Sequence, residues 1–491
     1  MHLDRRHILR VGLAVTALPS GSLLEACSRV QQPPQPPKSA ADHTIHIADA
    51  NVELAPGVVV RTTTYNGQYP GPLLRLHEGR PVTVDIHNDT ARPEQLHWHG
   101  QRVPVDVDGS AEEGTPFIPA KGSRRIGFTP GPAGLRFYHS HLVAGPDLGA
   151  GQYSGQVGPV YIEPKREAGR YDREVFLTLK EFEPSLSRGG DMAMDFLRPA
   201  TEDPKLKSTG QGAMKASLAS GAHHGYEVGY KHFTINGRML GHGEPVRVKA
   251  GERVLFHVLN GSATEIRSLA LPGHMFEVVA LDGNAVPTLA KVPVLWLGTA
   301  ERVSAIVEMT RPGVWVLGDT ADDDRRRGMG IVVEYAGQAG PAQWSAPPKS
   351  VWDYTRFGRS GAAPAADEVI DLTFAKDNAA LGGFNRWTIN GAAFDDRRME
   401  PMVKLVRGRR YRLRLHNASD DIHPVHLHRH AFELVRIAGQ PTSGVLKDVV
   451  MLGGYQTVEA DFVADNPGRT LFHCHQQLHM DFGFMALFDY A

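Results

Sequence analysis

Apolar and polar residues alternate over short stretches along most of the chain, and turn residues separate these stretches. Residues 82–87 and 410–416 are clear examples, with apolar side chains at every second position. Period-two alternation is typical of a β-strand that buries one face. No stretch shows sustained helical periodicity. The pattern therefore predicts an all-β protein built from short strands.

One pattern occurs three times. An Asn-Gly turn is followed each time by a Gly-led strand of alternating residues that ends at Asn. The turns lie at Asn66, Asn236 and Asn390, so the copies are 170 and 154 residues apart. The strands that follow them span 79–88, 251–260 and 408–417. A repeat of this size is a whole domain rather than a solenoid unit.

We therefore predict three consecutive Greek-key β-sandwich domains, which agrees with a length of 491 residues. The predicted domains span 44–165, 172–337 and 366–491. Residues 338–365, rich in Ala, Gly and Pro, form the predicted linker. Residues 184–227 interrupt the strand pattern and are predicted to be an insertion in the second domain.

The first 43 residues are predicted to be an export signal and a tether. Arg5 and Arg6 precede an uncharged run at 11–24, which resembles a twin-arginine export signal. That run is shorter than the ~20 residues that a helix needs to cross a bilayer. A Pro-rich tether at 31–38 follows. We expect a protein exported to the periplasm or cell envelope.

Residues 24–27 resemble a lipoprotein cleavage box in which Cys27 is acylated. The alternative is an ordinary cleaved signal that ends near Ala26. A lipid on Cys27 is the only membrane attachment that the sequence suggests.

Composition narrows the class of protein. The net charge of -1 shows no signature of nucleic-acid binding. The chain has 24 His but only 2 Cys, so no structural disulfide is expected if one Cys binds a metal. Four histidine clusters stand out, two in the first predicted domain and two in the third. They are His97-Trp98-His99, His139-Ser140-His141, His423-Pro424-Val425-His426-Leu427-His428 and His473-Cys474-His475 with His479.

Strand parity divides these residues into two sets. His473 and His475 should point to one side of a strand and Cys474 to the other. His423 has the parity of Cys474, and His479 can return to that side. Two His and one Cys are the ligand set of blue copper. One strand would thus serve two metal sites, with the backbone at Cys474 joining them.

Eight histidines remain, four from each terminal domain, and we expect them to meet at one interface. Eight neutral imidazoles without a carboxylate suit copper better than Mg²⁺, Ca²⁺ or Mn²⁺. Zinc could occupy some of these positions, but it would give no reason for an electron path through Cys474.

In this combination of motifs the chain resembles a bacterial, laccase-like three-domain multicopper oxidase, with cupredoxin-like (plastocyanin-like) domains. The resemblance implies four copper ions per chain. It assigns His423, Cys474 and His479 to type 1 copper, and His97 and His426 to type 2 copper. The ligands of the type 3 pair would be His99, His139, His141, His428, His473 and His475.

The chain departs from this family pattern at several positions. Phe484 stands where an axial Met is often found, and a noncoordinating axial side chain would raise the type 1 potential. The alternative is that Met485 reaches the axial position through a bulge. Met480 replaces an acid that feeds protons to oxygen in relatives, and Asp108 resembles the acid that some relatives use instead. Arg429 replaces a small residue, without an explanation from the sequence.

The resemblance implies one-electron oxidation of a small reducing substrate coupled to reduction of O₂ to water. Electrons would enter through the more exposed His479 and pass along Cys474. Phenols or aromatic amines are the first candidate substrates. Cu(I) or other metal ions are the alternative, suggested only by Met192, Met194 and Met214. A noncatalytic copper carrier is the third possibility. We expect a monomer.

Overall fold

A computed structural model describes residues 40–165, 171–187, 196–197, 202–221, 223–361, 363–397 and 399–490. Residues 41–491 form one compact unit. The predicted export signal, Cys27 and the tether lie outside the described residues, as do Met192 and Met194. Strands make up 49% of the described residues and helices 8%, which confirms the all-β prediction.

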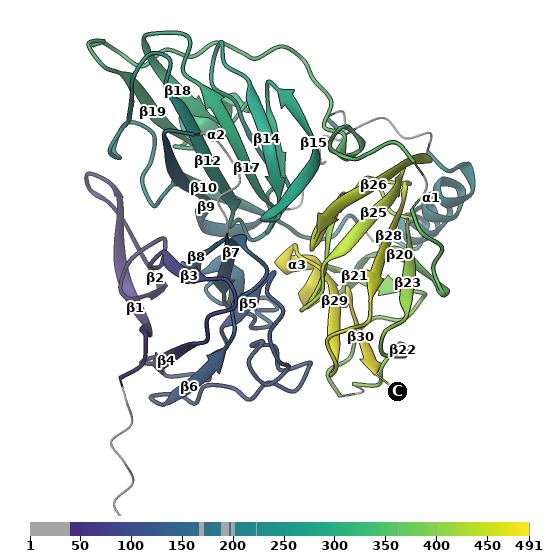
Figure 1. The fold of residues 1–491 in the computed structure, drawn as a ribbon. Helices are drawn as coiled ribbons and strands as arrows, with labels where there is room; N and C mark the ends of the chain where they lie inside the picture. The colour runs from purple at the N-terminus through teal and green to yellow at the C-terminus, as the bar shows by residue number, and fades with distance from the viewer. Residues whose placement is uncertain are drawn as a thin grey trace, which may run out of the picture. The chain divides into compact units, whose positions relative to one another are not determined.

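The first sandwich consists of two four-stranded sheets, β2-β1-β4-β6 and β3-β8-β7-β5 (Figure 1). Its elements are β1 (His43–Ala55), β2 (Val58–Tyr65), β3 (Leu74–His77), β4 (Val82–Asn88), β5 (His97–His99), β6 (Ser123–Phe128), β7 (Gly134–His139), the 3-10 helix η1 (Gly151–Tyr153) and β8 (Val157–Glu163).

The middle sandwich has a six-stranded sheet, β10-β9-β12-β17-β14-β15, and smaller sheets β11-β19-β18 and β13-β16. Its elements are β9 (Arg173–Ser187), α1 (Pro204–Ala219), β10 (Glu227–Ile235), β11 (Val246–Val248), β12 (Arg253–Asn260), β13 (Arg267–Leu269), β14 (Phe276–Leu281), β15 (Asn284–Val292), β16 (Leu295–Leu297), β17 (Arg302–Glu308), β18 (Val314–Gly318), α2 (Asp322–Arg326) and β19 (Gly330–Tyr335).

The third sandwich has sheets of six and five strands, β21-β20-β23-β28-β25-β26 and β22-β30-β29-β24-β27. Its elements are η2 (Tyr354–Phe357), β20 (Glu368–Leu381), β21 (Phe384–Ile389), β22 (Val403–Leu405), β23 (Arg410–Asn417), β24 (His423–Leu427), β25 (Phe432–Ile437), β26 (Gln440–Lys447), β27 (Val449–Leu452), β28 (Thr457–Val463), β29 (Thr470–Cys474), α3 (Gln477–Asp481) and β30 (Met485–Tyr490).

The repeated sequence pattern marks the same construction in each sandwich. The turn residues Asn66, Asn236 and Asn390 have φ of 54°, 53° and 52°, a left-handed conformation that Asn tolerates. Each of these side chains accepts a hydrogen bond from a strand N–H, that of His46, Thr178 or Thr373. The following Gly-led strand then pairs in parallel in all three sandwiches, as β1–β4, β9–β12 and β20–β23.

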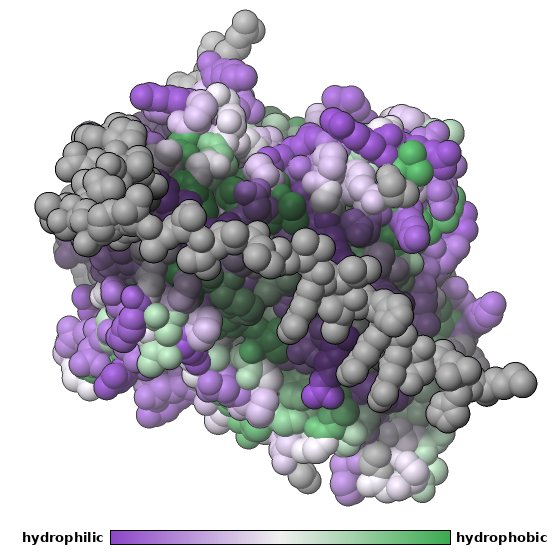
Figure 2. Space-filling model, turned by 90° about the horizontal axis from the view of Figure 1, so that it is seen from below, coloured by the Kyte–Doolittle hydropathy of each residue, from purple (hydrophilic) through white to green (hydrophobic). Residues whose placement is uncertain are grey.

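Apolar strand faces pack into the interior. One cluster fills the first sandwich around Trp98, and a larger one, which includes Cys474 and Phe484, extends through the middle and third sandwiches. Exposed large apolar residues such as Val59 and Leu289 are scattered, and Figure 2 shows hydrophobic areas interleaved with hydrophilic ones. No helix among the described residues is long and apolar enough to span a membrane.

The insertion, for which the sequence predicted only an interruption of the strand pattern, contains a helix. Strand β9 continues to Ser187, and α1 (Pro204–Ala219) follows between it and β10. Helix α1 has no buried residues. A helix without a buried face lacks the apolar stripe by which a helix is recognised in a sequence. It begins at a cap in which Asp203 accepts a hydrogen bond from Lys205 N. The helix lies beside β20 of the third sandwich (Figure 1).

The predicted linker is ordered and packs against the domains. Trp352, Tyr354 and Phe357 are buried, and the last two belong to η2. The Tyr354 hydroxyl donates to Glu301 at 2.6 Å. The segment rich in Ala, Gly and Pro therefore connects two sandwiches and also packs against them.

Candidate metal centre

The four histidine clusters come together between the first and third sandwiches. In the first, β5 pairs with β7 so that His97 is opposite His139. In the third, β24 pairs with β29 so that His426 is opposite His473. Figure 1 shows β5 and β7 near β29 and α3. Rings from the two sandwiches are in contact, with centroids 3.9 Å apart for His99 and His426.

Eight imidazoles form three groups, two of which share His99. Within each group the candidate ligand atoms all lie within 4.8 Å of one another. The groups are His97, His99 and His426; His99, His139 and His475; and His141, His428 and His473. Each group takes residues from both terminal sandwiches, so the site requires the two sandwiches to be docked.

Hydrogen bonds orient the rings so that one nitrogen is left for a metal. The Nδ1–H groups of His97, His139 and His426 donate to backbone carbonyls at 2.7–2.9 Å. Their Nε2 atoms are buried and have no hydrogen-bond partner. Buried polar atoms are rarely left unsatisfied, and a ligating His characteristically uses its second nitrogen in this way. The donor set thus fits copper, which imidazole suits.

Burial keeps these rings neutral, as metal ligands must be. Desolvation, followed by repulsion between neighbouring rings, lowers the pKa of His99, His139, His428 and His475 well below the ordinary value. Desolvation also lowers the pKa of His426, to about 3.

The metal-free protein should therefore lose stability in acid. In the unfolded chain these imidazoles take up protons below about pH 6.5, whereas in the fold they stay neutral. The unfolded chain then binds more protons, so the free energy of unfolding is largest above about pH 6.5 and falls as the pH is lowered. Chemical denaturation of the apoprotein between about pH 7.5 and about pH 5 measures this slope. A flat profile would contradict the assignment of neutral buried rings.

A separate group lies on the other face of β29. His423 Nδ1 and His479 Nδ1 are 3.1 Å apart, and Cys474 Sγ lies 3.7 and 3.5 Å from them. Metal–nitrogen bonds of about 2.0 Å and metal–sulfur bonds of about 2.3 Å, the lengths seen for zinc, would separate three ligands by roughly 3.3–3.8 Å. The three atoms can therefore bind one ion.

Hydrogen bonds with neighbouring side chains orient His423 so that its Nδ1 can bind a metal. The Ser419 hydroxyl donates to Asn417 Oδ1 at 2.8 Å, so it accepts the Nε2–H of His423 at 2.8 Å. That bond leaves His423 Nδ1 free to face the thiol. Burial raises the pKa of Cys474, and a bound cation would supply the charge that stabilises its thiolate.

Aromatic side chains surround this second group. Phe484 is buried with its ring 4.8 Å from that of His423. Met485 instead packs with Leu471 and Met480 in a separate cluster. The expectation of a relatively exposed His479 was wrong. His479 is only 1% exposed, because the Trp387 ring lies against it, with centroids 4.1 Å apart.

Asp108 contacts the eight-imidazole site directly. Its carboxylate lies 3.0 Å from His97 Nδ1 and accepts the Nδ1–H of His428 at 2.9 Å. Burial by itself would raise its pKa, but His97, together with Glu113 and Arg429, holds the pKa of Asp108 below its usual value. Asp108 thus orients one ring from each terminal sandwich.

Two further acids of the same loop were missed in the sequence. Glu113 accepts a hydrogen bond from Leu471 N at 2.6 Å, and burial and the Asp108 charge raise its pKa well above the ordinary value. Glu112 lies 3.6 Å from His141 Nδ1. The structure also explains Arg429, which is buried with Nε 3.6 Å from Glu113 and donates to the 467–469 carbonyls. For Glu112 and Glu113, closeness to Asp108 in the sequence was the only indication that they belong to the site.

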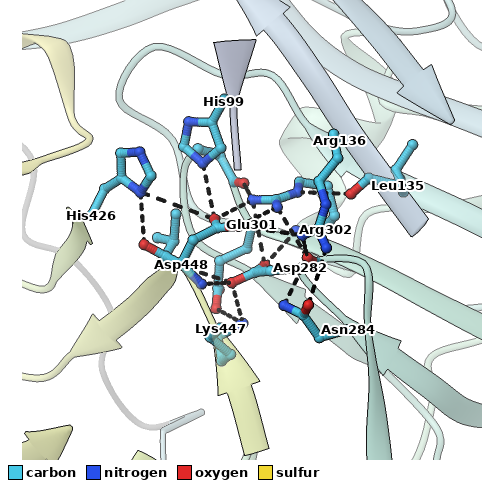
Figure 3. Close-up of polar contacts among 12 residues, drawn as sticks. His99, Leu135, Arg136, Asp282, Asn284, Glu301, Arg302, His426, Lys447 and Asp448 are labelled. Atoms are coloured by element: carbon cyan, nitrogen blue, oxygen red, sulfur yellow. Dashed lines mark hydrogen bonds and ion pairs between the residues drawn. The ribbon is translucent and has the colours of Figure 1, made fainter. Parts of the chain in front are cut away.

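A buried charge network with residues from all three sandwiches supports the site (Figure 3). Asp448 accepts from His99 Nε2 at 3.0 Å, and its carbonyl accepts from His426 Nδ1. Arg302 donates to both Asp448 carboxylate oxygens at 2.6 Å. Arg136, Asp282, Asn284, Glu301 and Lys447 complete the network. Its members come from separate stretches of the chain around residues 136, 282–302 and 447–448, so no local pattern indicated it.

Comparison with known proteins agrees with this site. Models of the multicopper oxidase family match residues 46–167, 207–333 and 367–491. The chain is 28% identical to multicopper oxidase MmcO of Mycobacterium tuberculosis, over 99% of this chain and 97% of that protein. It is 24% identical to Laccase-3 of Thanatephorus cucumeris, over 90% of each.

Among solved structures, Fet3p, a multicopper oxidase that functions in iron import, is similar with a TM-score of 0.71 and 18% identity. The match covers 91% of this chain and 90% of Fet3p. A multicopper oxidase from Pseudomonas thermotolerans gives a TM-score of 0.68 and 22% identity over 92% of this chain and all of that one. At these sequence identities, the similarity to the two solved structures shows a shared fold.

Proposed function

The chain belongs to the multicopper oxidase family of copper oxidoreductases, and on that premise we propose that it is a laccase-like enzyme. It would oxidise phenols or aromatic amines one electron at a time. Four substrate molecules each lose one electron, and a phenol also loses one proton. Four electrons and four protons then convert O₂ to two molecules of water.

We propose the following ligands for four copper ions. His423, Cys474 and His479 hold type 1 copper, and His97 and His426 hold type 2 copper. The type 3 pair is held by His99, His139, His141, His428, His473 and His475. Bound copper would supply one-electron transfer at the first site and O₂ reduction at the others.

One observation carries this proposal. Cys474 Sγ lies among His423 and His479, while the adjacent His473 and His475 belong to two of the imidazole groups on the opposite face. Two peptide units therefore join the substrate-oxidising side to the oxygen-reducing side covalently. A copper carrier would have no use for this connection, and the family assignment disfavours that alternative.

The choice of an organic substrate is supported by Phe484 and by the absence of a dense methionine segment from the sequence. Of the three methionines considered in the insertion, only Met214 is described, and it is half-buried in α1. Oxidation of metal ions remains the second candidate, because Fet3p, a structural neighbour, functions in iron import.

Oxygen uptake by the copper-loaded protein tests the proposal. Dimethoxyphenol and Cu(I) are supplied in parallel at matched concentrations. Faster uptake with the phenol supports the laccase-like function. Preference for Cu(I) would assign the enzyme to metal-ion oxidation instead.

We also propose that the protein is exported through its twin-arginine-like leader and acts as a monomer in the cell envelope. Mass spectrometry of the mature protein distinguishes acylated Cys27 from cleavage near Ala26. Sedimentation of the purified protein measures its oligomeric state.

Phe484→Met should lower the reduction potential of the type 1 site. Phe484 lies beside His423 and offers no ligand atom, which favours Cu(I), whereas a thioether would stabilise Cu(II). Redox titration of the blue absorption measures the change. Phe488→Met, a buried substitution in β30 away from the ligands, serves as the control. An unchanged potential in Phe484→Met would show that Phe484 does not tune the type 1 site.

A further inference from the structure

The ammonium of a half-buried lysine lies beside the proposed type 1 ligands. Lys376, in β20, forms ion pairs with Asp420 at 2.6 Å and Asp421 at 2.8 Å. Its side chain is 9% exposed, whereas that of Asp420 is 36% exposed. The ion-paired cluster thus connects the interior to solvent on this side of the third sandwich.

One aromatic side chain separates this cluster from the ligands. Lys376 is opposite Trp387 in the β20–β21 pair, and its Nζ lies 5.5 Å from the centre of the Trp387 ring. The same ring contacts His479 and His423, with centroids 4.1 and 4.9 Å apart. The Trp387 ring therefore lies next to both the Lys376 ammonium and the two histidines.

The backbone of the loop that carries the two carboxylates is anchored independently of Lys376. Asn417 donates to the carbonyl of Asp421 at 2.7 Å, and the Asp421 N–H donates to Ser419 at 3.3 Å. Helix α1 packs on the same loop so closely that a Cβ at Gly210 would lie 2.0 Å from the Ala418 carbonyl. Removing the ammonium would leave two neighbouring carboxylates on an anchored loop.

The surroundings are acidic. Burial and then the charge of Asp421 raise the pKa of Glu227 to about 8, and Lys376 opposes that rise. Carboxylate oxygens are the ligands that hard metal cations prefer. Without Lys376, this side of the ligand set would attract cations. With it, the carboxylates are already paired through charge-assisted bonds.

We propose that Lys376 determines the substrate class by occupying the place of a cation beside His479 and Trp387. Its charge keeps metal-ion reductants away and leaves electron entry to neutral or anionic organic molecules. This inference rests on the proposed laccase-like function.

Lys376→Met tests the inference, because Met retains an unbranched apolar stem without the charge. In the copper-loaded variant we expect the KM for Fe(II), followed by oxygen uptake, to fall by about tenfold or more. The KM for dimethoxyphenol should stay close to that of the wild type. Lys376→Arg should keep the wild-type preference. Lys404→Met, at an exposed position of β22, is the matched control.

A binding measurement complements the kinetics. Equilibrium dialysis of the copper-loaded proteins against Co(II) should show one more ion bound to Lys376→Met than to the wild type. Adding Asp421→Asn to that variant should remove the extra ion. Unchanged blue absorption in the variants shows that the type 1 ligands are intact. If Lys376→Met does not fold, Lys376→Gln replaces it.

Two failures can be distinguished. If Lys376→Met and Lys376→Gln keep the wild-type KM for Fe(II) and bind no extra Co(II), the inference is wrong although phenol oxidation stands. If the wild type oxidises Fe(II) or Cu(I) in preference to dimethoxyphenol, the proposed function itself is wrong.

Discussion

Cys474→Ser should abolish both the blue absorption and the oxygen uptake of the copper-loaded protein. The colour depends on a copper–thiolate bond, which Ser cannot form. Turnover should fall by about a thousandfold or more, as when one member of a cooperating catalytic set is removed. Cys474 is also the only cysteine among the described residues, so no other thiol there can substitute. Visible spectroscopy and oxygen uptake with dimethoxyphenol measure the two losses.

The bound copper content is the control for this variant. The eight imidazoles on the opposite face of β29 keep their hydrogen bonds, so about three of four copper ions should remain. Loss of all copper would mean that the substitution disrupts the fold instead. Retention of either the colour or the turnover in a folded variant would overturn the assignment of Cys474.

Asp108→Asn should lower turnover by about 10- to 100-fold, the usual effect of losing a group that orients metal ligands. The carboxylate contacts Nδ1 of His97 and of His428, and Asn lacks its charge. Asn also cannot hold or release a proton during oxygen reduction. Turnover of the variant should therefore rise as the pH is lowered, because protons must then come from solution.

Steady-state oxygen uptake across pH measures this effect, with Asp106→Asn as the matched control. Asp106 lies in the same loop but is exposed, so its variant should behave as the wild type does. A wild-type rate and pH profile in Asp108→Asn would remove Asp108 from the reaction. Loss of copper with a normal pH profile would leave it only a positioning role.

Much of the fold could be predicted because the relevant signals are local. Alternation of apolar and polar residues decides which strand face is buried. The three Asn-Gly turns then mark equivalent positions in the sandwiches. The same alternation places Cys474 opposite His473 and His475, and the structure has these side chains in separate ligand groups.

Three features could not be predicted. Helix α1 packs through close approach at Gly210 rather than through an apolar stripe. The burial of His479 depends on Trp387, which is 92 residues earlier in the chain. The role of Arg429 depends on Glu113, more than 300 residues away in sequence.

The sequence by itself determined the repeated turn-and-strand pattern of the three domains, the separation of two ligand sets across one strand, and the residue types that suit copper. Only the tertiary structure decided which imidazole nitrogens are free, how Asp108 and Asp448 orient them, and that Lys376 lies beside Trp387. The reason is physical. Side-chain direction along a strand follows from adjacent residues, whereas burial, charge pairing and pKa depend on contacts between distant segments.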